Sequence, residues 1–319
     1  MPDEPPGRRR SSVSDTGPKS VGGARPKSAP GRRIAIIGHL GRVQVRREAQ
    51  RLRDALTRKG AVVRLERELA GTLGTTGESL PVLARWCQVL VSLGGDGTVL
   101  TAGRALAGQK GVLLGVNMGG LGFLAAAEGR ELDQAMAAAL KGDWPVASRT
   151  GVETRVKRAR GGRAKHAGFA LNDAVIRSAT SYSAMHMRVS ALGQDLGHLV
   201  ADGLIAASSS GSTAYSLSAG GPLVAPDLDS LVVTPACAHA LGSRSLVLSP
   251  TSTVSVRIIS PGPALLVMDG QEAEELGKDD EVELQLAPTR VRVFENPDRP
   301  FLRALQAKLG WQGSDRRSL

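Results

Sequence analysis

The sequence predicts an α/β half followed by a β-rich half, and two observations predict this division. From residue 34 to about residue 141, short apolar segments alternate with segments whose apolar residues recur at the 3.6-residue period of a helix. Beyond residue 141 the period changes to two, the spacing of side chains on one face of a strand. Strands that alternate with helices form a mostly parallel sheet, with ligands at the carboxyl ends of its strands.

Apolar patterns place the elements of the first half in order. The expected strands are residues 34–38, 61–65, 89–93 and 112–116, each a short apolar run. The expected helices are residues 43–59, a short helix through 83–86, then 98–107 and 131–141. Residues 70–78 are rich in Gly and Thr, so we expect a mobile loop there.

The second half is expected to consist mainly of strands. Alternating segments occur at residues 152–156, 187–191, 254–258 and 282–286. Gly161-Gly162 and Asp269-Gly270 are turn signals between such segments. Beyond Pro300, a short amphipathic helix over residues 301–309 is expected to pack back on the first domain.

Composition and charge restrict the class of protein. The chain has 319 residues, 41% of them hydrophobic and 3% aromatic, so its core must consist mainly of Leu, Val and Ala. Residues 1–33 have no apolar periodicity and carry eight Lys or Arg against three acidic residues, a net +5 of the total +11. We expect this basic tail to be disordered. A mildly basic body suits anionic substrates, but it would equally suit nucleic acid.

Other classes are disfavoured because their signals are missing. Cys87 and Cys237 are the two cysteines, and neither they nor five scattered histidines have metal-ligand spacing, so we expect no metal site built from protein side chains. No apolar run is long enough to span a bilayer, and no signal peptide pattern occurs, so we expect a soluble cytoplasmic protein without a membrane partner. Walker A, G-x-G-x-x-G and G-x-S-x-G patterns are also absent.

A glycine-rich turn follows the expected strand 89–93. Gly94, Gly95 and Gly97 surround one carboxylate, Asp96, and the expected helix begins directly afterwards. This order presents backbone N–H groups and a helix N-terminus to a phosphate. An acid there would repel phosphate unless it takes a proton from an attacking hydroxyl or handles the metal ion of the phosphate. The alternative is a tight turn with a helix-capping Asp.

A second stretch concentrates hydroxyl and small side chains. Asp202-Gly203-Leu204-Ile205 is followed by GSTAYSLSAGGP, from Gly211 to Pro222. Hydroxyls and backbone amides in a glycine-rich bend suit phosphate and ribose, and Tyr215 can lie against a flat ring. The alternative is a Ser/Gly loop that leads into a helix.

Together these stretches closely resemble the NAD kinase family. The family hallmarks stand here as GGDGT (Gly94 to Thr98), LGF (Leu121 to Phe123), Asn172-Asp173, DGL and GSTAYSLSAGGP (Asp202 to Pro222), Asp269-Gly270-Gln271 and AKLGW (Ala307 to Trp311). The resemblance implies a fold of class α/β plus all-β: an N-terminal Rossmann-like α/β domain with the GGDGT turn, then a C-terminal β-sandwich domain. We therefore expect the tail over 1–33, the nucleotide-binding α/β domain over 34–125, and the NAD-binding domain over 126–299. The C-terminal helix, residues 300–311, would pack on the α/β domain.

The resemblance also implies an activity: phosphoryl transfer from ATP to the 2′-hydroxyl of the adenosine ribose of NAD. A divalent metal cation, Mg²⁺, would enter with ATP, and the enzyme would be a homodimer or homotetramer. Inorganic polyphosphate is an open alternative as donor. Two other readings also stay open, a lipid kinase of the same GGDGT superfamily and a non-catalytic basic nucleic-acid-binding protein.

The resemblance assigns roles to individual residues. Asp96 matches the catalytic acid and Gly97 its partner in the turn, while Phe123 matches a residue of the adenine pocket. Asn172 and Asp173 match an Asn–acid pair near the ribose hydroxyls. The remaining residues that the resemblance places at NAD or ATP are Thr213, Ala214, Tyr215, Ser216, Leu217 and Ser218 of the NAD-binding loop, Asp202 and Ala236, which act partly from a neighbouring subunit, and Gln271.

Overall fold

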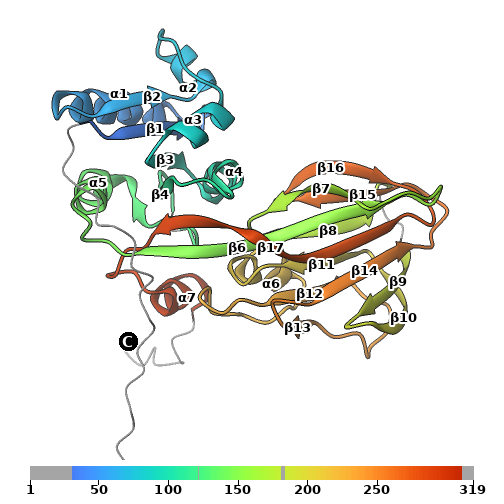
Figure 1. Ribbon diagram of the computed structural model, residues 1–319. Coiled ribbons are helices and arrows are strands. Elements are labelled where there is room, and N and C mark those ends of the chain that lie inside the picture. Colours follow the sequence, from blue (N-terminus) through green and yellow to red (C-terminus); the bar gives the residue numbers. More distant parts are fainter. Residues whose placement is uncertain (1–30, 121, 181–183, 311–319) are drawn as a thin grey trace, which may run out of the picture.

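The computed structural model describes residues 31–120, 122–180 and 184–310. An N-terminal α/β unit and a C-terminal β-sandwich are joined through one continuous sheet (Figure 1). The predicted fold class is therefore confirmed. Most of the predicted disordered tail, residues 1–30, lies outside the described residues, as do Leu121 of the LGF motif and Trp311.

The α/β unit is built on parallel strands in the spatial order β2-β1-β3-β4. Their bounds are β1 (Arg33–Gly38), β2 (Val62–Leu65), β3 (Val89–Gly94) and β4 (Val112–Asn117), and a short strand, β5 (Ala127–Glu128), pairs with the end of β4. The helices between and after them are α1 (Val43–Arg58), α2 (Arg67–Thr72), α3 (Leu80–Trp86), α4 (Asp96–Leu106), the 3-10 turn η1 (Gly129–Glu131) and α5 (Leu132–Lys141).

The sequence pattern explains these elements. All residues of β3 are buried, as expected for a largely apolar strand covered on both faces. The buried residues of α1 are Val45, Ala49, Leu52 and Leu56, which form the predicted helical stripe.

The C-terminal half is a β-sandwich. Its first sheet contains β6 (Val146–Lys157), β7 (Lys165–Ala170), β9 (Met185–Ala191), β10 (Gln194–Ala201), β14 (Thr253–Ile258) and β17 (Glu281–Phe294). Its second sheet contains β8 (Asp173–Ser178), β11 (Gly203–Ala207), β12 (Leu231–Ala236), β13 (Leu246–Leu248), β15 (Ala264–Met268) and β16 (Gln271–Leu276). One core cluster takes alternate residues from both sheets, among them Val254 and Val256 from the first and Leu204 and Ala206 from the second.

Strand β17 joins the two halves. Its Arg292 and Val293 pair in parallel with Val112 and Leu113 of β4, while most of β17 pairs antiparallel with β6. Figure 1 shows β6 and β17 running from the sandwich to the α/β unit. The parallel sheet and one sandwich sheet are therefore a single sheet of eleven strands.

One sequence-based expectation about the first half needs correction, and a second we replace with a proposal. Residues 70–78 are not all loop, because α2 ends at Thr72. The carboxylate of Glu66 caps α2 by accepting hydrogen bonds from the N–H groups of Glu68 and Leu69, at 3.0 and 3.1 Å. Helix α5 packs its apolar side chains into the core of the α/β unit. We therefore propose a domain boundary after Lys141 rather than at residue 125.

The C-terminal helix α7 (Phe301–Leu309) contacts the α/β unit through charged side chains. The ammonium of Lys308 lies 4.4 Å from the centre of the Phe123 ring. Arg299, just before α7, forms ion pairs with Glu128 and Glu131 at 3.2 and 2.8 Å. Across the described part of the chain, no helix combines the length and apolar character needed to cross a membrane.

Candidate active site

The glycine turn and its acid lie where β3 meets α4. Gly95 caps the helix and Asp96 is its first residue. One carboxylate oxygen, Asp96 Oδ2, accepts a hydrogen bond from the backbone N–H of Phe123 at 3.2 Å. The other, Asp96 Oδ1, is buried and has no hydrogen-bond partner among the described residues. A buried oxygen without a partner is costly, so this oxygen is suited to a ligand.

Glycine is required opposite that oxygen. A Cβ atom on Gly122 would lie 2.1 Å from Asp96 Oδ1 and 3.0 Å from Asn117 Nδ2. Asn117 in turn accepts a hydrogen bond from the N–H of Gly119 at 2.9 Å. The loop after β4 therefore packs directly against the carboxylate, at a distance that glycine alone permits.

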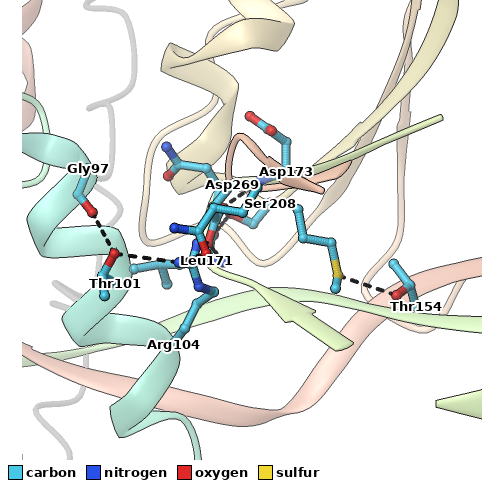
Figure 2. A network of polar contacts seen from close by, with 11 residues as sticks. Gly97, Thr101, Arg104, Thr154, Leu171, Asp173, Ser208 and Asp269 are labelled. Carbon is cyan, nitrogen blue, oxygen red and sulfur yellow. Dashed lines mark hydrogen bonds and ion pairs between the residues drawn. The ribbon is translucent and has the colours of Figure 1, made fainter. Parts of the chain in front are cut away.

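A second group of polar residues is organised by Asp269, in the tight turn between β15 and β16. Its carboxylate is fully buried and accepts hydrogen bonds from the backbone N–H groups of Leu171, Asn172 and Asp173, at 2.8, 2.8 and 3.3 Å. Arg104 of α4 completes its set of partners at 3.3 Å (Figure 2). We call Asn172, Asp173 and Asp269 the polar corner.

The environment of Asp173 favours its protonated form. Burial is the main cause, and the nearby charge of Asp269 adds to it; together they raise the pKa of Asp173 to about 7. The backbone N–H of Tyr215 acts in the opposite direction. Asp173 can therefore either donate or accept a hydrogen bond near neutral pH.

Asn172 presents a second oxygen without a partner. Its side-chain Oδ1 is buried and receives no hydrogen bond from the described residues. Its backbone carbonyl lies so close to Gly211 that a Cβ there would be 2.0 Å from the oxygen. Residues 208–218, which we call the serine-rich loop, are thus held directly against the polar corner.

Most hydroxyls of the serine-rich loop stabilise the loop itself. Ser208 donates to the carbonyl of Leu171 at 2.6 Å, and Ser212 donates to the carbonyl of Ser209 at 2.7 Å. The hydroxyl of Ser216, predicted to bind NAD, is fully buried and lies 2.9 Å from that of Thr234. Its side chain therefore points into the protein interior, where it stabilises the loop. The predicted residues with side chains at least partly accessible are Thr213, Ala214, Tyr215, Leu217 and Ser218.

Three further predicted residues lie in different places. Gln271 is beside the polar corner, where its side-chain oxygen accepts a hydrogen bond from Arg104 at 2.8 Å. Asp202 and Ala236 share a hydrogen bond, N–H to carbonyl, at the far end of β11. Strand β11 lies between this pair and Ser208, so Asp202 and Ser208 are about 20 Å apart. Within one chain Asp202 and Ala236 do not join Asp96 and the polar corner.

Sequence reasoning missed the roles of Asp269 and Arg104. Asp269 was noted as part of a turn signal and of the Asp269-Gly270-Gln271 motif, but not as a site residue. Its positive φ of 48° is uncommon outside glycine and marks a constrained position. No local signal connects Arg104 with a residue 165 positions away.

The polar groups also fit an ion that enters with phosphate. Among residues 31–120, 122–180 and 184–310, no three or more His, Cys, Asp or Glu side chains are grouped to hold a metal. Asp96 Oδ1 is a carboxylate oxygen, the type that Mg²⁺ prefers, and Mg²⁺ commonly keeps several waters and binds one or two carboxylates plus phosphates. This oxygen could therefore hold Mg²⁺ or accept a proton, and the two roles are alternatives for one atom.

A parallel sheet, an acid in a glycine turn at a helix N-terminus and a facing polar corner together define a nucleotide-binding phosphotransferase. Two sequence families match the chain, described as the ATP-NAD kinase N-terminal domain over residues 34–144 and the ATP-NAD kinase C-terminal domain over residues 171–295. The NAD kinase of Pseudomonas paraeruginosa is 35% identical over 288 residues, covering 88% of this chain and 97% of that protein. The NAD kinase of Geobacter metallireducens is 38% identical over 242 residues, covering 76% and 84%. The chain belongs to the NAD kinase family.

Solved structures share the fold. Yeast NADH kinase complexed with NADH superposes with a TM-score of 0.84 at 22% identity, covering 91% of this chain and 90% of the yeast chain. An NAD kinase from Archaeoglobus fulgidus in complex with ATP gives a TM-score of 0.68 at 23% identity, covering 87% and 97%. The family assignment removes the grounds for a lipid kinase or a non-catalytic nucleic-acid-binding protein.

Proposed function

We propose that this chain transfers the γ-phosphoryl group of ATP to the 2′-hydroxyl of the adenosine ribose of NAD, giving NADP. The observation that carries the proposal is Asp96 Oδ1, a buried carboxylate oxygen that has no partner among the described residues and stands at the first residue of a helix. A helix N-terminus attracts phosphate, and a free carboxylate oxygen accepts a proton.

Asp96 would act as the general base. The N–H of Phe123 holds one carboxylate oxygen and leaves the other for the ribose hydroxyl. Removing the proton of that hydroxyl as the bond to phosphorus forms is typically worth about 10²- to 10⁴-fold in rate. The remaining acceleration would come from positioning and from neutralising phosphate charge, to which Mg²⁺ contributes when it is bound.

The polar corner would hold the ribose. Asn172 Oδ1 can accept a hydrogen bond from a ribose hydroxyl, and its amide can donate one. When it is deprotonated, Asp173 can accept a hydrogen bond from a second ribose hydroxyl. Since the pKa of Asp173 is raised to about 7, binding of NAD should improve as the pH rises through neutrality.

Asp202 and Ala236 would contribute only in an oligomer. They lie at the end of β11 remote from Asp96, so a second copy of the chain would have to bring them to a site. We therefore retain a homodimer or homotetramer as part of the proposal. Light scattering coupled to gel filtration tests it, and a monomer at assay concentration would contradict it.

One assay tests the proposed function. The purified chain is incubated with Mg²⁺, NAD and either ATP or inorganic polyphosphate, and NADP is detected with an NADP-specific dehydrogenase. We expect the wild-type chain to form NADP with at least one donor. The Asp96→Asn variant should form NADP at no more than about one percent of the wild-type rate. A wild-type chain that forms no NADP with either donor would contradict the proposal.

A further inference from the structure

A chain of polar contacts connects the glycine turn with the polar corner. Thr101 of α4 donates a hydrogen bond to the backbone carbonyl of Gly97 at 3.1 Å. Arg104, one turn further along the helix, reaches the hydroxyl of Thr101 at 3.5 Å and Asp269 at 3.3 Å. Figure 2 shows these contacts as one network between α4 and the polar corner.

The contact of α4 with the polar corner is also apolar. A Cβ atom on Gly103 would lie 2.7 Å from Leu171 Cδ2, so the helix approaches Leu171 as closely as glycine permits. Leu171 and the inner face of α4 belong to the same buried cluster. Asn172 follows Leu171 directly, so a shift of α4 would be transmitted to the polar corner.

The charges at this contact favour arginine. Asp269 is fully buried, and the side chain of Arg104 is only 20% exposed. One guanidinium group reaches both Asp269 and Gln271, the latter at 2.8 Å. The planar fork of arginine can bind two acceptors at fixed directions, whereas the single ammonium of lysine has no such fork.

We infer that Arg104 is a positioning residue of the phosphoryl transfer: it fixes the separation between the Asp96 turn and the Asn172–Asp173 pair. The inference rests on the proposed function, because it assigns the base to the first site and the acceptor ribose to the second. The base and the ribose come from different halves of the molecule. Arg104 lies on α4, the helix that begins at Asp96. Its side chain hydrogen-bonds to Asp269, the acid that organises the polar corner.

Arg104→Gln tests this role, and Arg51→Gln is the matched control. Arg51 also joins two elements, through an ion pair from α1 to Asp133 at 2.8 Å, but it lies outside the site. Since a misplacement of about 1 Å can cost about 10²-fold in rate, we expect kcat of Arg104→Gln to fall by about 10- to 100-fold. The KM for ATP should change less than about threefold, because the glycine turn itself is intact. The melting temperature should fall more in Arg104→Gln than in Arg51→Gln, because Arg104 pairs with a buried carboxylate and Arg51 with an exposed one.

The pH profile separates positioning from general destabilisation. The groups that face Asp173 are Asp269, from the turn after β15, and the backbone N–H of Tyr215, from α6 (Tyr215–Ser218); Arg104 faces Asp269. Removing Arg104 leaves the charge of Asp269 less neutralised, so the pKa of Asp173 should rise further. The rise of kcat/KM for NAD should therefore occur at higher pH in Arg104→Gln and at the wild-type pH in Arg51→Gln.

Arg104→Lys decides the matter if Arg104→Gln does not fold. It keeps a positive charge beside Asp269 but cannot bind Asp269 and Gln271 with one planar fork. A fall in kcat of about threefold or more at an unchanged melting temperature supports the inference. Folded Arg104 variants with kcat within about twofold of Arg51→Gln overturn it. A wild-type chain without NADP formation contradicts the proposed function instead, so the two failures are distinguishable.

Discussion

The carboxyl groups of Asp173 and Asp269 lie close together in a buried region, and their polar partners differ. Asp269 receives three backbone N–H groups and Arg104, which together stabilise its charge. Asp173 has the charge of Asp269 as its neighbour and few polar partners, and its pKa is raised to about 7. Asp173 is therefore an acid at this site that titrates near neutral pH.

This difference predicts a pH-dependent stability. Between pH 4 and pH 7 the unfolded chain has released the proton of Asp173 while the folded chain retains it, so the free energy of unfolding falls as pH rises. Asp173→Asn cannot titrate. We would measure urea unfolding of both proteins at pH 5 and at pH 8. The free energy of unfolding of the variant minus that of wild type should be larger at pH 8 than at pH 5, by on the order of 3 kcal/mol. A difference that stays constant with pH would contradict the raised pKa.

Gly122 and Gly120 provide a second test at the residue scale. A Cβ on Gly122 would lie 2.1 Å from Asp96 Oδ1, whereas a Cβ on Gly120 would meet nothing within 4 Å. Gly122→Ala must displace the carboxylate, so kcat should fall by about 10²-fold or more, while Gly120→Ala should stay within about twofold of wild type. Steady-state kinetics of NADP formation decide this. Equal activities of the two variants would show that Asp96 is not confined by Gly122.

At this scale the sequence was a good guide to which residues stand at glycine turns, and a poor guide to their contacts. Asp96 followed from a strand, a glycine turn and a helix that are adjacent in the chain. The unpaired oxygens of Asp96 and Asn172 depend on which distant backbone groups approach them. Such approaches leave no periodic signal in the sequence.

Among the elements, the serine-rich loop differs most from its sequence interpretation. Its hydroxyls suggested a phosphate or ribose cradle, but the hydroxyls of Ser208, Ser212 and Ser216 bind carbonyls or Thr234 within the protein. Side chains that cap neighbouring backbone groups are common for serine in turns. The backbone of the loop and its more exposed residues, including Tyr215, are left for a ligand.

The loop should tolerate no side chain at Gly211. A Cβ there would lie 2.0 Å from the carbonyl oxygen of Asn172, a backbone atom that cannot move aside cheaply. Gly211→Ala should therefore cost about 1–3 kcal/mol or more in free energy of unfolding and lower kcat/KM for NAD. Gly262→Ala, with nothing within 4 Å of its Cβ, is the control and should change stability by less than about 0.5 kcal/mol. Similar unfolding midpoints would contradict the close packing of the loop on Asn172.

For the whole molecule, the two halves are connected more closely than the sequence indicated. The change of period after residue 141 predicted two architectures correctly, but not their common sheet. Strand β17 pairs with β4 across about 180 positions of sequence, and pairing over such distances has no local pattern. The expected domain boundary at residue 125 would separate helix α5 from strands that precede it in the chain and share its core cluster, and such packing also has no local pattern.

The shared sheet predicts a single unfolding transition. Separating the halves would break the pairing of β17 with β4 and expose the cluster that contains α4, Leu171 and Val291. We therefore expect differential scanning calorimetry to give one peak, in which both halves unfold together. Two resolved peaks would show that the α/β unit and the sandwich unfold independently.

The most direct test of the account is the rate of NADP formation by Asp96→Asn across a titration of Mg²⁺. The substitution keeps the size of the side chain and removes its charge and its basicity. If Asp96 is the base, the rate should stay about 10²- to 10⁴-fold below wild type at every Mg²⁺ concentration, while NAD binding, measured by calorimetry, is retained. Recovery to a kcat near wild type at saturating Mg²⁺ would contradict this, because it would show that Asp96 serves only to hold the metal.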